Sequence, residues 1–290
     1  MDMRALAMGL MFATIWSSAF TSARIIVADA SPLAALSVRF LISGAIALVL
    51  ARALGESLVL TRAQWRATII FGICQNALYL GLNWVAMQTL EASVAAIIAS
   101  TMPLLVAAAG WAFAGERIGP LGTAGLIAGF AGVALIMSTR ISGGADPVAM
   151  GLCAIGALAL TFATLVARGA MSGGNIWTVV GMQMLVGGVA LLPPALLFED
   201  WHIAWNGPVI AAYLYTIFMP GLVATFIWLL LVRRIGATRA STFHFLNPFL
   251  GVAIAALLLG EALGPLDIAG VAIIMAGILA VQMAKGRRPA

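Results

Sequence analysis

The sequence predicts an all-α membrane protein with ten transmembrane helices, arranged as two inverted five-helix repeats with both chain ends in the cytoplasm. Three observations lead to this prediction. First, 63% of the 290 residues are hydrophobic and only 9% are charged, which is more apolar surface than a soluble domain can bury. Second, uncharged apolar stretches of about 20 residues recur along the whole chain. Third, nearly the same phrase occurs twice, 145 residues apart.

The apolar stretches set the bounds of the expected helices, because each is long enough to cross a bilayer. The first stretch could pass for a signal peptide, but it is too long and carries Trp16 near its centre, so we assign it as a spanning helix. The short connections leave no room for a soluble domain, and the chain has no GxxxxGK[ST] phosphate loop. We expect helices over 3–27, 32–54, 64–86, 91–114, 120–139, 147–170, 176–198, 207–232, 237–259 and 265–284.

The basic residues predict the orientation of the chain. With the N-terminus in the cytoplasm, twelve of the fifteen Lys and Arg residues lie on the cytoplasmic side, as the positive-inside rule requires. This also accounts for the net charge of +5 without a nucleic-acid partner. We therefore expect a multi-pass protein of the bacterial inner membrane. The cytoplasmic set is Arg4, Arg52, Arg62, Arg66, Arg117, Arg168, Arg233, Arg234, Arg239, Lys285, Arg287 and Arg288.

The repeated phrase reads GERIGPLGTAG at 115–125 and GEALGPLDIAG at 260–270. An ungapped alignment of 90–137 with 235–282 gives 14 identities in 48 positions. The sequence therefore predicts a duplicated unit of five helices, over 1–145 and 146–290. Because five is odd, the second copy enters the membrane upside down, which is a common architecture of secondary transporters with a midplane substrate site.

Several of these residues resemble the EamA family of the drug/metabolite transporter superfamily. The first helix reads IWSSAFTSARIIV and is followed by SPLAALSVRF, and the GE–GP element occurs in both halves. The resemblance covers essentially the whole chain. It implies a secondary carrier that exports amino acids or other small metabolites, and the chain is most similar to the YddG-type exporters of aromatic and neutral amino acids.

A polar face in the third expected helix is the clearest candidate for a binding site. Gly72, Asn76, Tyr79 and Asn83 follow one another at spacings of four, three and four, which places them on one side of an α-helix. Such a face borders a substrate cavity, or it holds helices together by hydrogen bonds. The repeat maps it onto an apolar counterpart in the eighth helix, formed by Gly221, Ala224 and Trp228.

Other candidate substrate contacts come from single residues inside spans. Trp16 either stacks on substrate or packs in the bundle. The hydroxyl groups of Ser17, Thr101 and Thr161 either bind polar groups or bond the backbone of their own helix. Asn247, which precedes a proline, is expected near the lumen.

Prolines inside three expected helices are candidate gating positions. Pro103 and Pro248 occupy matching positions of the two repeats, and Pro220 interrupts the eighth helix. Proline frees a backbone carbonyl and kinks a helix. The kinks either bend during gating or are static.

His244, the one histidine inside a span, either carries a coupling proton or acts as a neutral hydrogen-bond donor. No Asp or Glu lies near the middle of an expected helix, so we expect facilitated or weakly coupled transport. The alternative is a proton-coupled exporter of other metabolites or drugs. An intramembrane enzyme is less favoured, because neither GxSxG nor HExxH occurs.

We expect no catalytic residue, cofactor or metal site, and we read Cys74 and Cys153 as small buried residues. The expected partners are a small-molecule substrate and the lipid bilayer. Arg39 is deep enough to bond carbonyls or a carboxylate, and Glu116 and Glu261 are expected to cap the next helix or to pair with a basic neighbour. The glycines of the fifth helix, including a GxxxG, are expected to pack within a monomer, with a dimer face as the alternative.

Overall fold

The structure is a computed structural model, and it describes residues 3–113, 119–166, 175–235, 240 and 242–286. These residues are helical apart from their connections and one isolated antiparallel bridge between Ala30 and Ile203. They contain nine helical segments long and apolar enough to cross a membrane, and a shorter apolar helix over Phe243–Leu259. An all-helical membrane protein is therefore confirmed.

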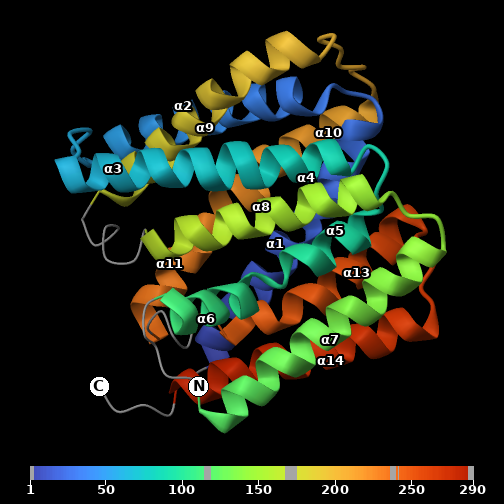
Figure 1. The fold of residues 1–290 in the computed structure, drawn as a ribbon. Coiled ribbons are helices and arrows are strands. Elements are labelled where there is room, and N and C mark those ends of the chain that lie inside the picture. The colour runs from blue at the N-terminus through green and yellow to red at the C-terminus, as the bar shows by residue number, and fades with distance from the viewer. Residues whose placement is uncertain (1–2, 114–118, 167–174, 236–239, 241, 287–290) are drawn as a thin grey trace. The chain divides into compact units, whose positions relative to one another are not determined.

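The helices lie close to the predicted ranges, but four of the ten expected helices are interrupted. The segments η1 and η2 are π-helices, and η3 is a 3-10 helix. Figure 1 shows the elements in chain order: α1 (Met3–Ala28), α2 (Pro32–Ala53), α3 (Arg62–Phe71), η1 (Gly72–Tyr79), α4 (Leu80–Ala86), α5 (Ala92–Ala99), α6 (Met102–Phe113), α7 (Pro120–Ser142), α8 (Pro147–Val166), α9 (Ile176–Phe198), α10 (Gly207–Thr216), η2 (Ile217–Val223), α11 (Ala224–Ile235), η3 (Thr242–Leu246), α13 (Asn247–Leu259) and α14 (Pro265–Gly286).

The chain divides into two compact units, each of which takes segments from both halves of the sequence. Unit 1 consists of Met1–Thr21, Thr89–Met150 and Val223–Ala290, and unit 2 consists of Ser22–Gln88 and Gly151–Leu222. In unit 1 the helices α7 and α14 lie side by side, and in unit 2 the same holds for α2 and α9 (Figure 1).

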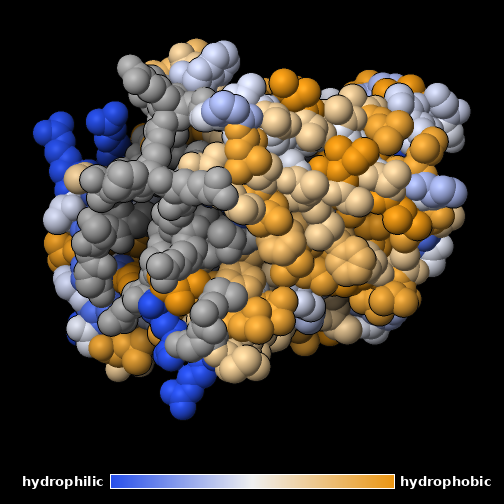
Figure 2. All heavy atoms as spheres, turned by 90° about the horizontal axis from the view of Figure 1, so that it is seen from below, coloured by the Kyte–Doolittle hydropathy of each residue, from blue (hydrophilic) through white to orange (hydrophobic). Residues whose placement is uncertain are grey.

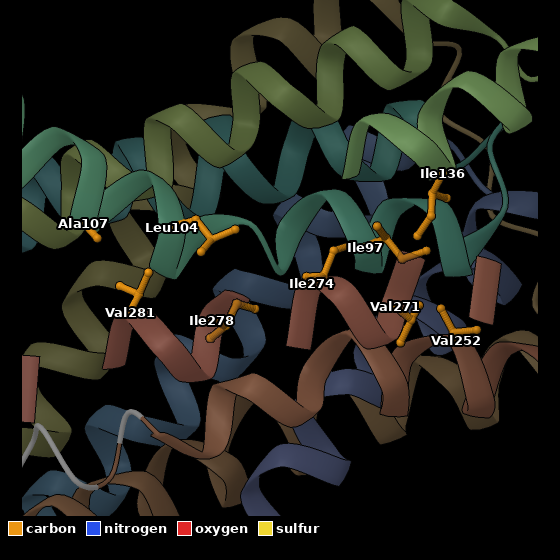
Figure 3. Close-up of a cluster of buried hydrophobic side chains, with 9 residues drawn as sticks. All are labelled: Ile97, Leu104, Ala107, Ile136, Val252, Val271, Ile274, Ile278 and Val281. Atoms are coloured by element: carbon orange, nitrogen blue, oxygen red, sulfur yellow. The ribbon is translucent and has the colours of Figure 1, made fainter. Parts of the chain in front are cut away.

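The core of unit 1 is a layer of branched aliphatic side chains between the α7/α14 pair and the helices α5, α6 and α13. Figure 3 shows these side chains pointing toward one another, with Leu104, Ile136, Ile274 and Ile278 fully buried. Large apolar side chains also lie on the outside: Leu257 is 83% exposed and Phe198 is 81% exposed. Hydrophobic residues cover much of the coloured surface in Figure 2, as expected for helices that face lipid.

The α7 and α14 helices approach closely because glycines lie where they cross. A Cβ atom on Gly277 would lie 2.6 Å from the carbonyl oxygen of Gly125, and one on Gly132 would lie 2.9 Å from that of Gly270. Each pair joins an early residue of one helix to a late residue of the other, so the helices are antiparallel. The glycines of the fifth predicted helix therefore pack inside unit 1.

The α2 and α9 helices of unit 2 cross in the same way. A Cβ atom on Gly44 would lie 3.0 Å from the carbonyl oxygen of Gly181, and the reverse distance is also 3.0 Å. At the other contact, the hydroxyl of Ser37 donates a 2.8 Å hydrogen bond to the carbonyl of Gly188. Small residues thus bring the backbones of both helix pairs together, which is how membrane helices gain van der Waals contact.

Glutamate side chains cap the starts of three helices. In unit 2, Glu199 follows α9 and accepts hydrogen bonds from Leu33 N and Ala34 N at the start of α2, at 2.8 and 2.9 Å. Glu56 follows α2 and accepts one from Thr178 N, at 3.0 Å, at the start of α9. The two helices therefore cap each other, and each carboxylate satisfies N–H groups that have no partner within the helix.

In unit 1, Glu261 follows α13 and caps α5. Its carboxylate accepts hydrogen bonds from Ala92 N at 2.8 Å and from Ser93 N at 2.9 Å. The expectation that Glu261 caps the next helix is wrong. The start of α14 has its own acid, because Asp267 accepts a 2.8 Å bond from Gly264 N. Glu116 lies outside the described residues.

Two of the three prolines expected inside helices, Pro103 and Pro248, mark breaks between helices. The expected helix over 91–114 ends at Ala99 and restarts as α6, with Pro103 in second place; α13 likewise starts with Pro248 in second place. This position suits proline, whose missing N–H has no partner in a first turn. At the first break, the Ser100 and Thr101 hydroxyls donate 2.7 Å bonds to carbonyls of α5. Pro220 is different, because it lies inside η2.

Glu199→Gln replaces the carboxylate that caps α2 by a neutral amide, one atom of which cannot accept a hydrogen bond. We expect the free energy of unfolding to fall by about 1–2 kcal/mol, measured as a lower thermal midpoint in detergent. Asp200→Asn is the matched control, because the neighbouring side chain is exposed. Equal midpoints for the two variants would contradict the capping role.

Gly277→Ala places a methyl group against the α7 backbone and forces α7 and α14 apart. We expect a loss of about 1–3 kcal/mol, typical of overpacking. Gly151→Ala, on α8, is the control, because a Cβ atom there meets nothing within 4 Å. The control should be neutral or stabilising, since alanine favours helix. If both variants unfold alike, the close crossing does not matter for stability.

Candidate functional site

Unit 1 holds a cluster of aromatic rings contributed by α1, α11 and η3. The Phe12 ring lies 4.8 Å from Trp228, 5.6 Å from Trp16 and 5.4 Å from His244, between ring centroids. Trp228 and His244 meet edge to face at 5.2 Å. Phe12 is 2% exposed, whereas the other three rings are half-buried. Three predicted substrate contacts therefore share one cluster, organised around a phenylalanine that the sequence did not single out.

A short hydrogen-bond chain holds His244 in this cluster. The side-chain nitrogen of Asn247 lies 3.0 Å from His244 Nδ1, and Ser17 Oγ donates to Asn247 Oδ1 at 3.5 Å. An amide nitrogen only donates, so Nδ1 accepts and the ring proton lies on Nε2. His244 is then a neutral donor. Asn247 begins α13 directly after η3, so the proline-marked break positions this chain.

The predicted polar face of the third helix forms a buried group in unit 2. Gly72, Asn76, Tyr79 and Asn83 are all buried, although part of the segment is a π-helix. The amide of Asn76 donates a 2.9 Å bond to the carbonyl of Gln183 on α9. The amide of Asn83 donates a 2.7 Å hydrogen bond to the carbonyl of Tyr79. Asn76 therefore joins two helices by a hydrogen bond.

One buried acceptor in this group has no partner in the described part of the chain. The Oδ1 atom of Asn83 makes no hydrogen bond, and Asn83 is 1% exposed. A Cβ atom on Gly156 of α8 would lie 3.0 Å from the Asn83 amide nitrogen. This glycine therefore lets α8 approach the polar face.

The two predicted threonine contacts lie outside both groups of side chains. Thr101 donates to the carbonyl of Ile98 at 2.7 Å, and Thr161 donates to that of Ala157 at 2.8 Å. Each hydroxyl thus bonds its own backbone, as lone hydroxyls in helices commonly do. The oxygen lone pairs remain as acceptors.

A cavity of about 430 Å³ in unit 1 was not predicted from the sequence. Arg140, at the end of α7, reaches both oxygens of Asp267 at 2.9 and 3.2 Å and also pairs with Glu91. Burial raises the pKa of Glu91, as do Glu261 and Asp267 nearby, and Arg140 opposes this. The sequence offered a signal for this cluster, because Arg140 is absent from the basic residues expected on the cytoplasmic side. These two ion pairs connect the end of α7 with the starts of α5 and α14.

The two groups offer different chemistry. The aromatic cluster presents ring faces and one N–H donor, which suits a small amphipathic molecule with an aromatic or apolar part. The group around Asn83 presents a side-chain carbonyl that has no hydrogen-bond partner among the residues the structure describes. Within the described residues, no three His, Cys, Asp or Glu side chains are grouped to hold a metal ion.

Asn247→Asp removes the N–H donor that fixes the His244 tautomer. We expect ring nitrogen-15 resonances to report an Nε2–H tautomer in the parent and a protonated Nδ1 in the variant. The chain has two histidines, so the measurement uses a His202→Gln background. Identical spectra with and without the substitution would contradict the assigned hydrogen bond.

The comparisons with known proteins agree with one another. The EamA-like transporter family matches the chain twice, over residues 3–138 and 148–283. YvbV of Bacillus subtilis (strain 168), named an uncharacterized transporter, is 26% identical over 92% of this chain and 88% of its own. YedA of Escherichia coli (strain K12), named an uncharacterized inner membrane transporter, is 27% identical over 97% and 92%.

Two further matches extend the comparison. Protein PecM of Dickeya dadantii (strain 3937) is 24% identical over 92% of this chain and 89% of its own. A solved crystal structure superposes with a TM-score of 0.69 over 100% of both chains at 19% identity, which shows a shared fold. Because the family match spans nearly all of both halves, the chain belongs to the EamA-like transporter family.

Proposed function

We propose that the chain is a secondary carrier that exports neutral or aromatic amino acids, or related small metabolites, across the bacterial inner membrane. It works by alternating access through a central cavity between two inverted five-helix repeats, 1–145 and 146–290, with both chain ends in the cytoplasm. Transport is facilitated or weakly coupled. The observation that carries this proposal is the double family match, in which the EamA-like family covers residues 3–138 and again 148–283.

Contacts between residues of equivalent position support the inverted repeat. In the repeat alignment, Gly125 corresponds to Gly270 and Gly132 corresponds to Gly277. In the structure the contacts are exchanged, because Gly125 lies against Gly277 and Gly132 lies against Gly270. A twofold axis perpendicular to the two helices makes them antiparallel and produces such an exchange. An axis parallel to the helices would instead place each residue in contact with its equivalent in the other repeat. The π-helical segments Gly72–Tyr79 and Ile217–Val223 also begin 145 residues apart.

The aromatic cluster supports the substrate class. An aromatic side chain gains about 0.5–1.5 kcal/mol from a well-placed ring partner beyond burial, and Trp16 and Trp228 are half-buried and thus partly accessible. The neutral His244 supplies a donor for a polar group on the same molecule. This combination fits the aromatic and neutral amino-acid exporters of the YddG type.

The positions of the carboxylates support weak coupling. Every described Asp and Glu lies in a connection or, for Asp267, in the first turn of a helix. Proton relays of pumps usually use carboxylates within the membrane. The amide of Asn247 also occupies His244 Nδ1, the ring nitrogen that would accept a coupling proton. The chain acts as a monomer, since the α7 glycines are used within unit 1.

Counterflow in proteoliposomes tests the proposal. Liposomes loaded with unlabelled phenylalanine should take up labelled phenylalanine saturably, at a rate little changed by a proton gradient. Strict dependence on the gradient would favour the proton-coupled alternative. Uptake that does not saturate would indicate a channel, and chemical turnover without movement would indicate an enzyme.

Trp228→Ala should raise the half-saturation concentration for phenylalanine about 2- to 10-fold. Alanine as substrate should be affected less, because it has no ring to stack. Trp111→Ala is the control, since Trp111 is 62% exposed on α6. If the two variants have the same effect, the cluster does not contact substrate.

A further inference from the structure

The contact between α2 and α10 in unit 2 contains a buried arginine whose charge is not balanced. Arg39 lies two turns into α2 and is 6% exposed. Its Nη2 and Nε atoms donate to the carbonyl of Thr216 at 3.1 and 3.4 Å, and its guanidinium carbon lies 4.8 Å from the centre of the Phe40 ring. In the described part of the chain, no carboxylate lies within ion-pair distance of Arg39.

The helix break around Pro220 explains why Thr216 accepts these bonds. In an α-helix its carbonyl would accept from the residue four positions later, which is Pro220, and proline has no N–H. The segment from Ile217 onward is a π-helix instead. Arg39 therefore supplies donors to a carbonyl that the proline leaves without its α-helical partner.

That role uses only part of the guanidinium. The side chain has five N–H donors, and a carbonyl is a neutral partner that leaves the positive charge uncompensated. A buried charge without a counter-charge is costly, all the more in a membrane. A neutral glutamine would satisfy the Thr216 carbonyl at lower cost. The charge itself is thus unexplained by packing.

A second buried polar group lies beside Arg39. Ser43 follows one turn later on α2, is 0% exposed, and its Oγ has no hydrogen-bond partner among the described residues. A Cβ atom on Gly221 would lie 3.7 Å from both Arg39 Nη2 and Ser43 Oγ. Both groups therefore face the same point of η2, where the residue has no side chain.

We propose that Arg39 and Ser43 form a carboxylate-binding half-site beside η2, and that it takes the carboxylate of the exported molecule. A planar guanidinium matches a carboxylate with two parallel hydrogen bonds, and the free hydroxyl adds a third donor. The half-site rests on the proposed function and deepens it, because it names the residues that recognise the acid group. A cargo carboxylate that arrives and leaves during transport accounts for an arginine beside which the described residues place no carboxylate.

The test compares phenylalanine with phenylalanine amide, which lacks the carboxylate. The wild-type protein should bind phenylalanine more tightly than the amide, in counterflow and as a ligand-induced rise of the thermal midpoint. Arg39→Gln keeps a donor for Thr216 and removes the charge. It should weaken phenylalanine at least about tenfold and leave the amide unchanged. Arg39→Lys should retain part of the preference for phenylalanine, since it keeps the positive charge but loses the planar guanidinium that makes two parallel hydrogen bonds.

Ser43→Ala carries the test if the Arg39 variants do not fold, because it removes only an unpaired hydroxyl. It should weaken phenylalanine about threefold and leave both the amide and the thermal midpoint unchanged. An equal loss for both ligands in every variant would mean that the pair is structural, and this would overturn the proposal. No loss for either ligand would overturn it as well.

An inorganic anion is the other source of negative charge. The assays are repeated with chloride replaced by gluconate. One outcome would assign the half-site to chloride and overturn the proposal. In it, transport by the wild-type protein requires chloride and transport by Arg39→Gln does not, while the preference for phenylalanine over its amide is the same in both. Failure of the proposed function looks different: the wild-type protein then shows no saturable counterflow. The half-site is in that case tested by the rise of the thermal midpoint that benzoate induces. We expect this rise in the wild-type protein and not in Arg39→Gln, and an equal rise in both proteins would overturn the proposal.

Discussion

Every backbone N–H and C=O group inside a membrane needs a partner from the protein, and this constraint organises the whole chain. Regular helices meet it internally. The informative side chains are those that meet it where helices start, stop or break. Glu199 and Glu56 bind the free N–H groups of α2 and α9, the hydroxyls of Ser100 and Thr101 bind carbonyls at the end of α5, and Arg39 binds the carbonyl opposite Pro220. These side chains therefore serve the places where the regular helix starts, stops or breaks.

The same exceptions place the candidate binding groups. The restart of the chain at Asn247 puts an amide beside His244, and the π-helical segment around Pro220 opens a carbonyl to Arg39. A carrier needs polar groups that are exposed to cargo yet shielded from lipid. Helix breaks provide them without a charged residue on the lipid face. In this account the α2–α10 contact of unit 2 recognises the acid group of the substrate.

The helices could be predicted from the sequence because bilayer thickness fixes their length. The range 176–198 matches α9, and 32–54 exceeds α2 by one residue. The breaks were harder, since proline indicates a disturbance but does not distinguish a kink from a restart, and π-helices carry no pattern of their own. Partners distant in sequence could not be assigned: Glu261 was expected to cap α14 or to pair with a basic neighbour, and it caps α5. Arg39 was identified as deep, but its carbonyl partner depends on a helix that begins 168 residues later.

The central claim is that two equivalent halves cross the membrane in opposite directions. Single cysteines at Ser57 and His202, both exposed and 145 positions apart, test it directly in a background where Cys74 and Cys153 are replaced by alanine. A membrane-impermeant maleimide added to intact cells should label the cysteine at position 202 at once and the one at position 57 only after permeabilisation. Labelling of both positions from the same side of the membrane would contradict the inverted repeat.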